Sequence, residues 1–156
     1  MAPRRAELRL VVDVAAPAER VWALATDWAR QGEWMLGTEV YVVAGDGRGP
    51  GSRLVAFTGI GGLGFLDTME ITHWEPPRRC DVRHTGRLVR GTGGFEVRPH
   101  GANSTRFTWY ERLELPLGPL GALGWPVVAP AFRWGLRRSL RTFAELCRRP
   151  AVGGAR

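Results

Sequence analysis

The chain has 156 residues, of which 44% are hydrophobic and 24% charged, the balance of an ordinary soluble globular protein. Two cysteines, Cys80 and Cys147, are too few for a disulfide scaffold, and neither lies in a Cys/His spacing that would bind zinc. This composition excludes disordered, collagen-like and disulfide-rich classes. It predicts one reduced, cytoplasmic domain over residues 1–156, with an ordered core at about 8–148 and a frayed tail at 150–156.

The first elements predicted along the chain are a strand and two short helices. Apolar residues at every second position from Leu8 to Ala15 indicate a half-buried strand. Pro17 then suits the first turn of a helix, where its missing N–H costs nothing. Asp27 is placed to cap a second short helix that ends near Gly37.

Six further strands are predicted between these helices and the C-terminal region. Alternating apolar residues and turn-rich joints place them at Glu39–Ala44, Ser52–Thr58, Leu66–Trp74, Arg79–Leu88, Gly91–Arg98 and Thr105–Leu115. Because the joints are short, the strands should form an antiparallel meander.

The C-terminal region is predicted to begin with an apolar segment and to end in a long helix. The uncharged run from Leu115 to Phe132 has the length of a membrane span, but its prolines and glycines would leave backbone groups unpaired in lipid. We therefore expect a lid or gate over an apolar pocket. From Phe132 to Cys147, apolar residues recur at helical spacing, so this helix should lay its apolar stripe on the inner face of the sheet.

Two segments resemble a known superfamily. Val12–Val14 followed by Ala16–Trp22 is similar to the opening of START-like SRPBCC proteins, the group that contains polyketide cyclase/dehydrase and lipid-transport proteins. Trp74–Arg79 is similar to the turn that this superfamily places between two central strands. The resemblance covers about Leu8 to Arg148 and implies an α+β helix-grip fold, a curved antiparallel sheet of about seven strands wrapped on the long C-terminal helix. It indicates the fold more specifically than the activity.

A glycine-rich segment, Gly59–Gly64, satisfies the GxGxxG pattern of dinucleotide-binding proteins. That pattern binds a pyrophosphate only where it leads from a strand into a helix, and here the following residues are predicted to be another strand. We expect a loop that acts as a flap at the mouth of the pocket.

The charge is concentrated near the C-terminus. All 22 basic residues are arginine, and the net charge is +7. Residues 131–156 contain seven arginines and one glutamate, which is +6 of that total. A stripe of Arg133, Arg137 and Arg141 on the last helix fits a solvated outer face. The neighbouring Trp134 keeps contact with a membrane surface open, whereas no motif typical of nucleic-acid binding accompanies the arginines.

Aromatic and large apolar residues are candidates for the walls of a ligand pocket. Their alternative role is a filled aromatic core. The resemblance favours a cavity between the sheet and the helix, because that architecture implies one. The candidate lining residues are Trp34, Phe57, Met69, Trp109, Trp125, Phe132 and Leu136.

His84 and Glu111 are candidate polar groups inside that pocket. His84 shares the strand parity of Val82, and Glu111 that of Trp109, so both should face inward; Asp67 and His73 have the parity of a third strand's core residues. A buried carboxylate and imidazole suit general acid–base catalysis. They equally suit a structural hydrogen bond or a site that orients a ligand, and no nucleophile completes a triad.

Three functions follow. The first is binding or transport of a hydrophobic small molecule, polyketide-like or lipid-like, with His84 and Glu111 orienting its polar end. The second is an aromatase/cyclase-type enzyme in which the same pair moves protons. The third is a peripheral membrane or partner-binding module that uses the arginine-rich helix. No cofactor or metal is expected, and the sequence leaves the oligomeric state open.

Overall fold

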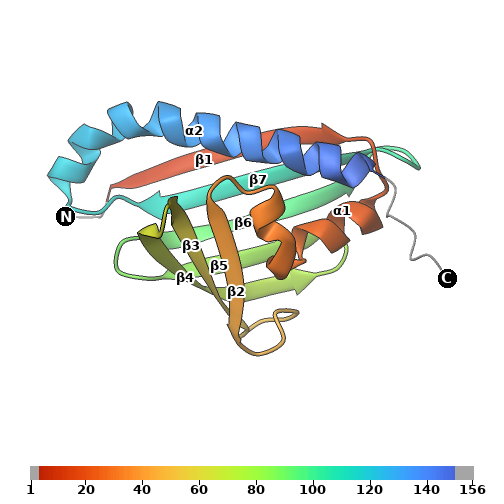
Figure 1. The fold of residues 1–156 in the computed structure, drawn as a ribbon, viewed down its shortest axis with the longest axis horizontal. Helices are drawn as coiled ribbons and strands as arrows, with labels where there is room; N and C mark the ends of the chain where they lie inside the picture. The colour runs from red at the N-terminus through yellow and green to blue at the C-terminus, as the bar shows by residue number, and fades with distance from the viewer. Residues whose placement is uncertain (1–3, 150–156) are drawn as a thin grey trace.

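The structure is a computed structural model that describes residues 4–149 (Figure 1). The predicted tail at 150–156 lies outside the described residues. The elements are β1 (Arg5–Val14), α1 (Ala18–Ala25), the 3-10 helix η1 (Trp28–Glu33), β2 (Thr38–Ala44), β3 (Arg53–Ile60), β4 (Leu63–Glu75), β5 (Arg79–Thr85), β6 (Arg90–Pro99), β7 (Thr105–Glu114) and α2 (Pro119–Arg148). This order confirms the predicted succession of a strand, two short helices, six strands and a long helix.

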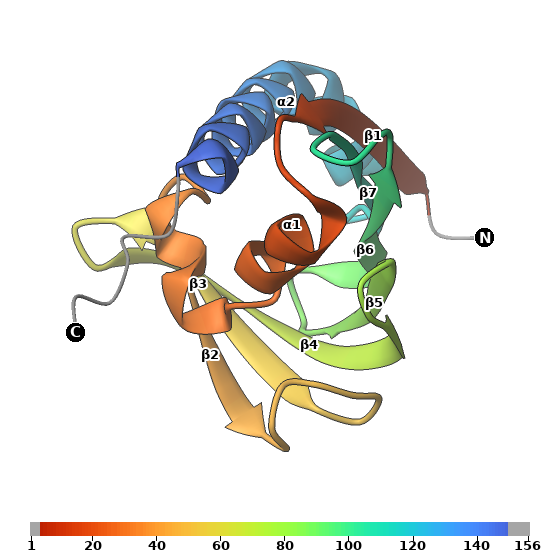
Figure 2. The same cartoon turned by 90° about the vertical axis from the view of Figure 1, so that its right-hand side faces the viewer.

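The strands form one antiparallel sheet in the order β1-β7-β6-β5-β4-β3-β2. Figure 2 shows the sheet curled around α1, with α2 closing its open side. The predicted α+β helix-grip fold is confirmed.

Aromatic side chains hold α1 and the C-terminal half of α2 against the inner face of the sheet. The ring of Trp22, on α1, lies 5.7 Å from that of Phe95 on β6. Phe143, on α2, lies 4.6 Å from Phe107 on β7 and 4.7 Å from Trp34 after η1. Because burying aromatic rings dominates the energetics of a core, these contacts fix α2 over the sheet.

The helix α2 begins earlier than predicted. The long helix was expected from Phe132, after a lid or gate at residues 115–132, but α2 starts at Pro119 and continues through Pro126 and Pro130. Pro119 lies in the first turn, where no backbone donor is lost, whereas each interior proline removes one hydrogen bond. Figure 1 shows α2 curving over the end of the sheet in this first half.

The glycine-rich segment forms a tight hairpin and not the six-residue loop that was expected. Strand β3 runs to Ile60 and β4 starts at Leu63, which leaves only Gly61 and Gly62 in the turn. Their φ angles are +61° and +80°, which glycine adopts without steric cost. A strand, turn and strand offer no helix N-terminus for a pyrophosphate, so the GxGxxG pattern here is a turn motif.

The remaining sequence features are placed as follows. Cys80 and Cys147 are both buried and free. Arg133, Arg137 and Arg141 are exposed on α2, as predicted for a solvated face. Among residues 4–149, no helix has the length and hydropathy needed to cross a bilayer.

Candidate functional site

Three neighbouring regions of the sheet bring a histidine and two carboxylates together. His84 lies on β5 opposite Met69 of β4, and Asp67 lies two residues before Met69 on the same face. Glu111 lies on β7, with β6 between it and His84. His84 and Glu111 therefore both face inward, at the parity that the sequence predicted.

A glycine on β6 allows His84 and Glu111 to meet across the intervening strand. Gly93 is the β6 residue opposite Glu111, and a Cβ atom added to it would lie 2.3 Å from Glu111 Oε2. Any other residue at this position would therefore occupy the space of the carboxylate. Gly91 and Gly93 lie on the same face of β6 as the inward-facing Phe95. Two glycines at inward positions of one strand are the sequence signal that could have predicted this contact.

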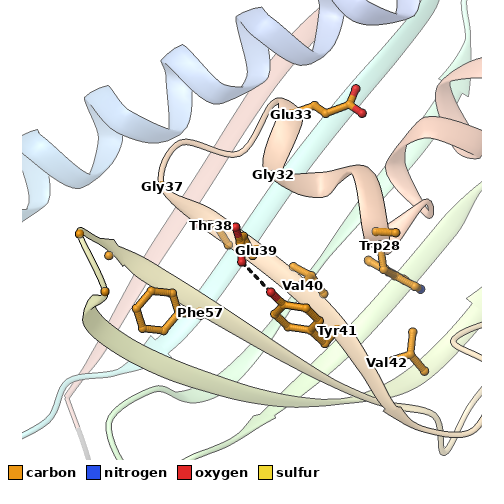
Figure 3. Close-up of a pocket in the computed structure, with 14 residues that line it drawn as sticks. Trp28, Gly32, Glu33, Gly37, Thr38, Glu39, Val40, Tyr41, Val42 and Phe57 are labelled. Atoms are coloured by element: carbon orange, nitrogen blue, oxygen red, sulfur yellow. Dashed lines mark hydrogen bonds between the residues drawn. The ribbon is translucent and has the colours of Figure 1, made fainter.

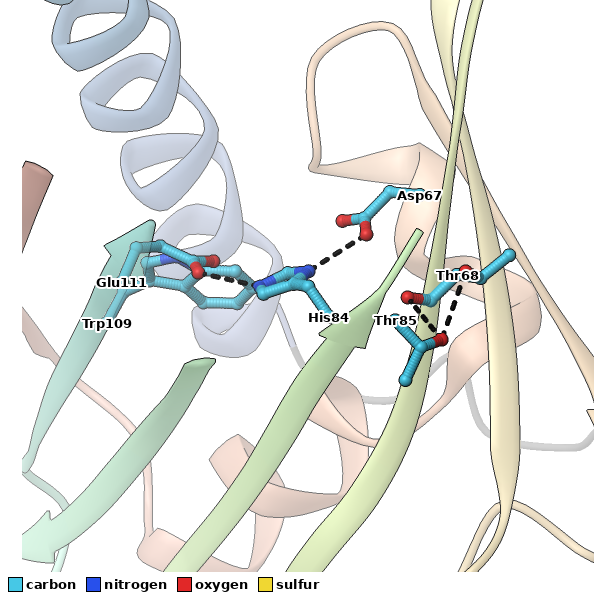
Figure 4. Close-up of polar contacts among 6 residues, drawn as sticks. All are labelled: Asp67, Thr68, His84, Thr85, Trp109 and Glu111. Carbon is cyan, nitrogen blue, oxygen red and sulfur yellow. Dashed lines mark hydrogen bonds and ion pairs between the residues drawn. The ribbon is translucent and has the colours of Figure 1, made fainter. Parts of the chain in front are cut away.

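The contacts within the group are direct hydrogen bonds (Figure 4). His84 Nδ1 lies 2.8 Å from Asp67 Oδ1, and His84 Nε2 lies 3.0 Å from Glu111 Oε2. Trp109 Nε1 donates to Glu111 Oε1 at 3.1 Å. The side chains of His84, Glu111 and Asp67 are only 4%, 11% and 15% exposed. We call Asp67, His84 and Glu111 the buried triad.

Burial and charge act in opposite directions on the triad. Burial lowers the pKa of His84, but the hydrogen bonds and charges of Asp67 and Glu111 outweigh it and raise the pKa to about 10. Burial raises the pKa of Glu111, and the hydrogen bond from His84 reduces that rise. At neutral pH, His84 is therefore an imidazolium whose two N–H groups donate to Asp67 and to Glu111.

The triad lies in the wall of a cavity of about 330 Å³ between the sheet and α2. Within residues 4–149, its lining comprises Gln31, Met35, Leu36, Thr38, Ala56, Thr58, Phe65, Asp67, Met69, His84, Val89, Trp109, Glu111, Leu113, Ala131, Phe132, Gly135, Leu136 and Ser139. The walls are mostly apolar, and the polar lining residues outside the triad are Gln31, Thr38, Thr58 and Ser139. This combination of volume and lining is typical of a small-molecule site.

A recess of about 40 Å³ extends the cavity inward. It shares Gln31, Met69, Trp109 and Glu111 with the main cavity. Gln31 Oε1 is buried without a hydrogen-bond partner, so an acceptor at the cavity wall is unsatisfied. A buried acceptor without a partner carries a desolvation cost that a ligand donor would offset.

The predicted lining residues divide into two groups. Met69, Trp109, Phe132 and Leu136 line the cavity. Trp34, Phe57 and Trp125 do not. Trp34 is buried in the core between Trp109 and Phe143, and Trp125 lies on α2 with its ring 6.1 Å from that of Phe132.

Phe57 lies on the outer face of the sheet, contrary to the prediction. Its neighbours Leu54 and Ala56 are the inward-facing residues of β3. Phe57 lines a depression of about 890 Å³ at the β2 edge of the sheet, to which Tyr41 and Trp28 also belong (Figure 3). The ionisable side chains there are Glu33, Glu39 and Tyr41, and the Tyr41 hydroxyl donates to Glu39 at 2.6 Å. This depression contains no group comparable to the buried triad.

His73 is also placed differently from the prediction. The β4–β5 pairing shifts register between Ile71 and His73, so His73 is exposed and pairs with Glu75 at 3.2 Å. Asp67, which shared the same predicted parity, does reach the cavity. Within residues 4–149, no group of three or more His, Cys, Asp or Glu side chains is arranged to hold a metal ion.

Comparisons with known proteins identify the family. Residues 5–148 match the family described as polyketide cyclase / dehydrase and lipid transport. The chain belongs to this family. Uncharacterized protein Rv1546 of Mycobacterium tuberculosis is a relative of the chain. The two are 30% identical over 147 residues, which cover 90% of this chain and 98% of the relative.

Several solved structures share the fold of this chain. The Zhui aromatase/cyclase from Streptomyces is 18% identical with a TM-score of 0.77, covering 97% of this chain and 100% of that one. TTHA0849 from Thermus thermophilus is 23% identical with a TM-score of 0.76, covering 91% and 97%. A START superfamily protein from Mycobacterium smegmatis is 20% identical with a TM-score of 0.70, covering 90% and 97%. The resemblance to START-like SRPBCC proteins is thus confirmed at the level of the fold.

Proposed function

We propose that the chain binds a hydrophobic small molecule, polyketide-like or lipid-like, in the cavity beneath α2. The observation that carries the proposal is a mostly apolar cavity of about 330 Å³ with a cluster of ionisable groups, the buried triad, in its wall. Apolar walls supply affinity without direction, and a few fixed polar groups orient the ligand.

The triad favours a ligand that donates hydrogen bonds. Both nitrogens of His84 are occupied by Asp67 and Glu111, so the imidazole offers the ligand neither a free donor nor a free acceptor. An ionised carboxylate has about four acceptor positions, and the triad uses only some of them. Together with the acceptor of Gln31, these positions suit the hydroxyl groups of a phenol or an alcohol.

The four lining residues that the sequence anticipated supply the apolar contacts. Met69 and Trp109 belong to the sheet, whereas Phe132 and Leu136 belong to α2. A ligand between these surfaces would touch both layers of the fold. Binding should therefore stabilise the folded protein by an amount that grows with the logarithm of the ligand concentration above its Kd.

Titration with an apolar fluorescent probe tests this proposal. Ala56 is buried and lines the cavity, whereas Val55 lies on the opposite face of the same strand. We expect one probe per chain for the wild type, no binding for Ala56→Phe, and unchanged binding for Val55→Phe. Circular dichroism checks that both variants fold. Equal probe binding by the wild type and a folded Ala56→Phe would contradict the proposal.

The buried triad also supports a second candidate function, an aromatase/cyclase-type enzyme. Burial raises the pKa of Glu111, which brings a carboxylate at the cavity wall closer to the range in which it can both accept and donate a proton. In this function Glu111 exchanges a proton with the substrate, and His84 and Asp67 determine how readily Glu111 is ionised.

Turnover separates the two functions. An enzyme should cyclise a poly-β-keto thioester, and Glu111→Gln should lower its rate by roughly 10²–10⁴-fold with little change in affinity. A binding protein should show no turnover above the uncatalysed rate, and the same substitution should change probe affinity instead. A rate that Glu111→Gln leaves unchanged would exclude the enzymatic role of this residue.

A further inference from the structure

Large apolar side chains remain exposed at the end of the molecule where the cavity lies. They belong to three segments, the β3–β4 hairpin, the β5–β6 loop and the stretch from Leu117 through the first half of α2, which gather at the left of Figure 1. The exposed residues are Ile60, Leu63, Leu88, Leu117, Leu120, Leu123, Val127 and Val128. We call this set the apolar rim. Ile60 is 89% exposed and Val127 80%, and a contiguous exposed apolar patch marks a surface that contacts a partner or a membrane.

The rim adjoins the cavity. Each of its three segments also contributes a residue to the cavity lining: Phe65 from β4 just after the hairpin, Val89 from the β5–β6 loop and Phe132 from α2. The rim and the lining are therefore consecutive parts of the same segments. A surface that contacts the rim would lie next to the cavity.

The first half of α2 is apolar on two sides. Leu120, Leu123 and Val127 follow the i, i+3, i+7 spacing of one helix face, and all three are exposed. Trp125 and Phe132 lie on the other side, with their rings 6.1 Å apart. A helix that is apolar around its circumference is usually buried on every side, and α2 is covered on only one.

The charges that follow the rim along α2 have one sign. Between Glu114 and Glu145 the chain contains no acidic residue, and α2 continues from its apolar half into Arg133, Arg137 and Arg138. Trp134 is 61% exposed, with the guanidinium of Arg138 lying 5.8 Å from its ring centre. Apolar residues bordered by tryptophan and arginine are typical of helices that lie in the interface of an anionic membrane.

A second copy of the chain is a poorer partner for this surface. The chain carries a net charge of +7. A symmetric contact between two rims would bring the arginines of both copies together, and like charges at an interface disfavour binding. An anionic lipid surface instead supplies both the apolar phase and the opposite charge.

We propose that the apolar rim docks on an anionic lipid surface and turns the cavity toward the acyl chains. Leu120, Leu123 and Val127 enter the boundary between headgroups and acyl chains, and the arginines that follow them on α2 lie among the lipid phosphates. A hydrophobic ligand then passes between bilayer and cavity without crossing water. This last step rests on the proposed function, whereas the docking does not.

Flotation with vesicles of equimolar phosphatidylcholine and phosphatidylserine tests the docking. The triple variant Leu120→Gln, Leu123→Gln, Val127→Gln removes three exposed side chains from the rim. We expect the bound fraction of this variant to fall at least about tenfold, because its apolar contact with the bilayer is lost. A matched control replaces three exposed apolar residues of β1 and β2, with the changes Val11→Gln, Tyr41→Gln and Val43→Gln. The control should float like the wild type.

Two further measurements separate docking from ligand binding and from self-association. The cavity-filling variant Ala56→Phe should still float, so failure of the proposed ligand and failure of docking give different results. Size-exclusion chromatography should show the same oligomeric state for the wild type and the triple variant. The proposal is overturned if the wild type does not float, if the triple variant floats equally well, or if the triple variant dissociates a dimer that the wild type forms.

Discussion

The imidazolium at the centre of the buried triad should make the protein less stable as the pH rises above neutrality. The pKa of His84 is raised from 6.5 to about 10 in the folded state. The folded protein therefore holds a proton that the unfolded chain has released. The resulting stability is fully present below the unfolded pKa of 6.5 and is lost as the pH rises toward 10.

The size of the effect follows from the difference in proton affinity. A tenfold change in proton affinity corresponds to about 1.4 kcal/mol, so raising the pKa from 6.5 to about 10 sets an upper limit of about 5 kcal/mol. Glu111 acts in the same direction at lower pH. Because its pKa is raised in the folded state, its contribution to the free energy of unfolding falls as the pH rises above 4.5. The free energy of unfolding should therefore decline as the pH rises from 6.5 toward 10.

Urea denaturation at a series of pH values measures this decline. His84→Gln removes the titrating group, so the stability of this variant should depend much less on pH between 6.5 and 9. At pH 7 the variant should be less stable by about 3–5 kcal/mol, because two buried carboxylates lose their cationic partner. His73→Gln is the matched control, since His73 is an exposed histidine beside a single glutamate. Identical pH profiles for the wild type and His84→Gln would refute the protonated triad.

Three further predictions concern other positions. Gly93→Ala should displace the Glu111 carboxylate and lower the pKa of His84 measured by NMR, whereas Gly49→Ala, whose Cβ atom meets nothing within 4 Å, should leave it unchanged. Gln31→Leu removes an unpaired buried acceptor and should raise unfolding stability by about 1 kcal/mol while weakening a hydroxyl-bearing ligand, and a loss of stability in urea would contradict this. Burial raises the pKa of Cys80 and of Cys147 to about 12, so iodoacetamide at pH 8 should label the native protein far more slowly than the urea-unfolded chain.

Local sequence patterns were sufficient for the strands and for the inward direction of His84 and Glu111. Both residues lie on strands with a clear alternation, in which the core residues Val82 and Trp109 define the inner face. Strand β3 lacks such alternation, because Leu54, Val55, Ala56 and Phe57 are all apolar. The larger Phe57 was therefore assigned to the inner face, although the structure places the small Ala56 there.

The other differences arise from tertiary contacts that a local pattern does not contain. The register shift in β4 turns His73 outward. The helix α2 continues through Pro126 and Pro130, which sequence rules interpret as breaks. The meeting of His84 and Glu111 depends on the absence of a side chain at Gly93, a residue on the strand between them. Asp67 has the inward parity that the sequence predicted, but its contact with His84 depends on the pairing of β4 with β5, which the pattern of one strand does not contain.

Native mass spectrometry tests the central claim most directly. The wild type and Ala56→Phe are incubated together with a lipid extract from the cells that produce the protein, separated from free ligand and sprayed without denaturation. The account predicts one small apolar molecule bound to each wild-type chain, while Ala56→Phe remains at its own mass because its cavity is filled. Adducts on both proteins in equal amounts, or on neither, would contradict a ligand-binding cavity beneath α2.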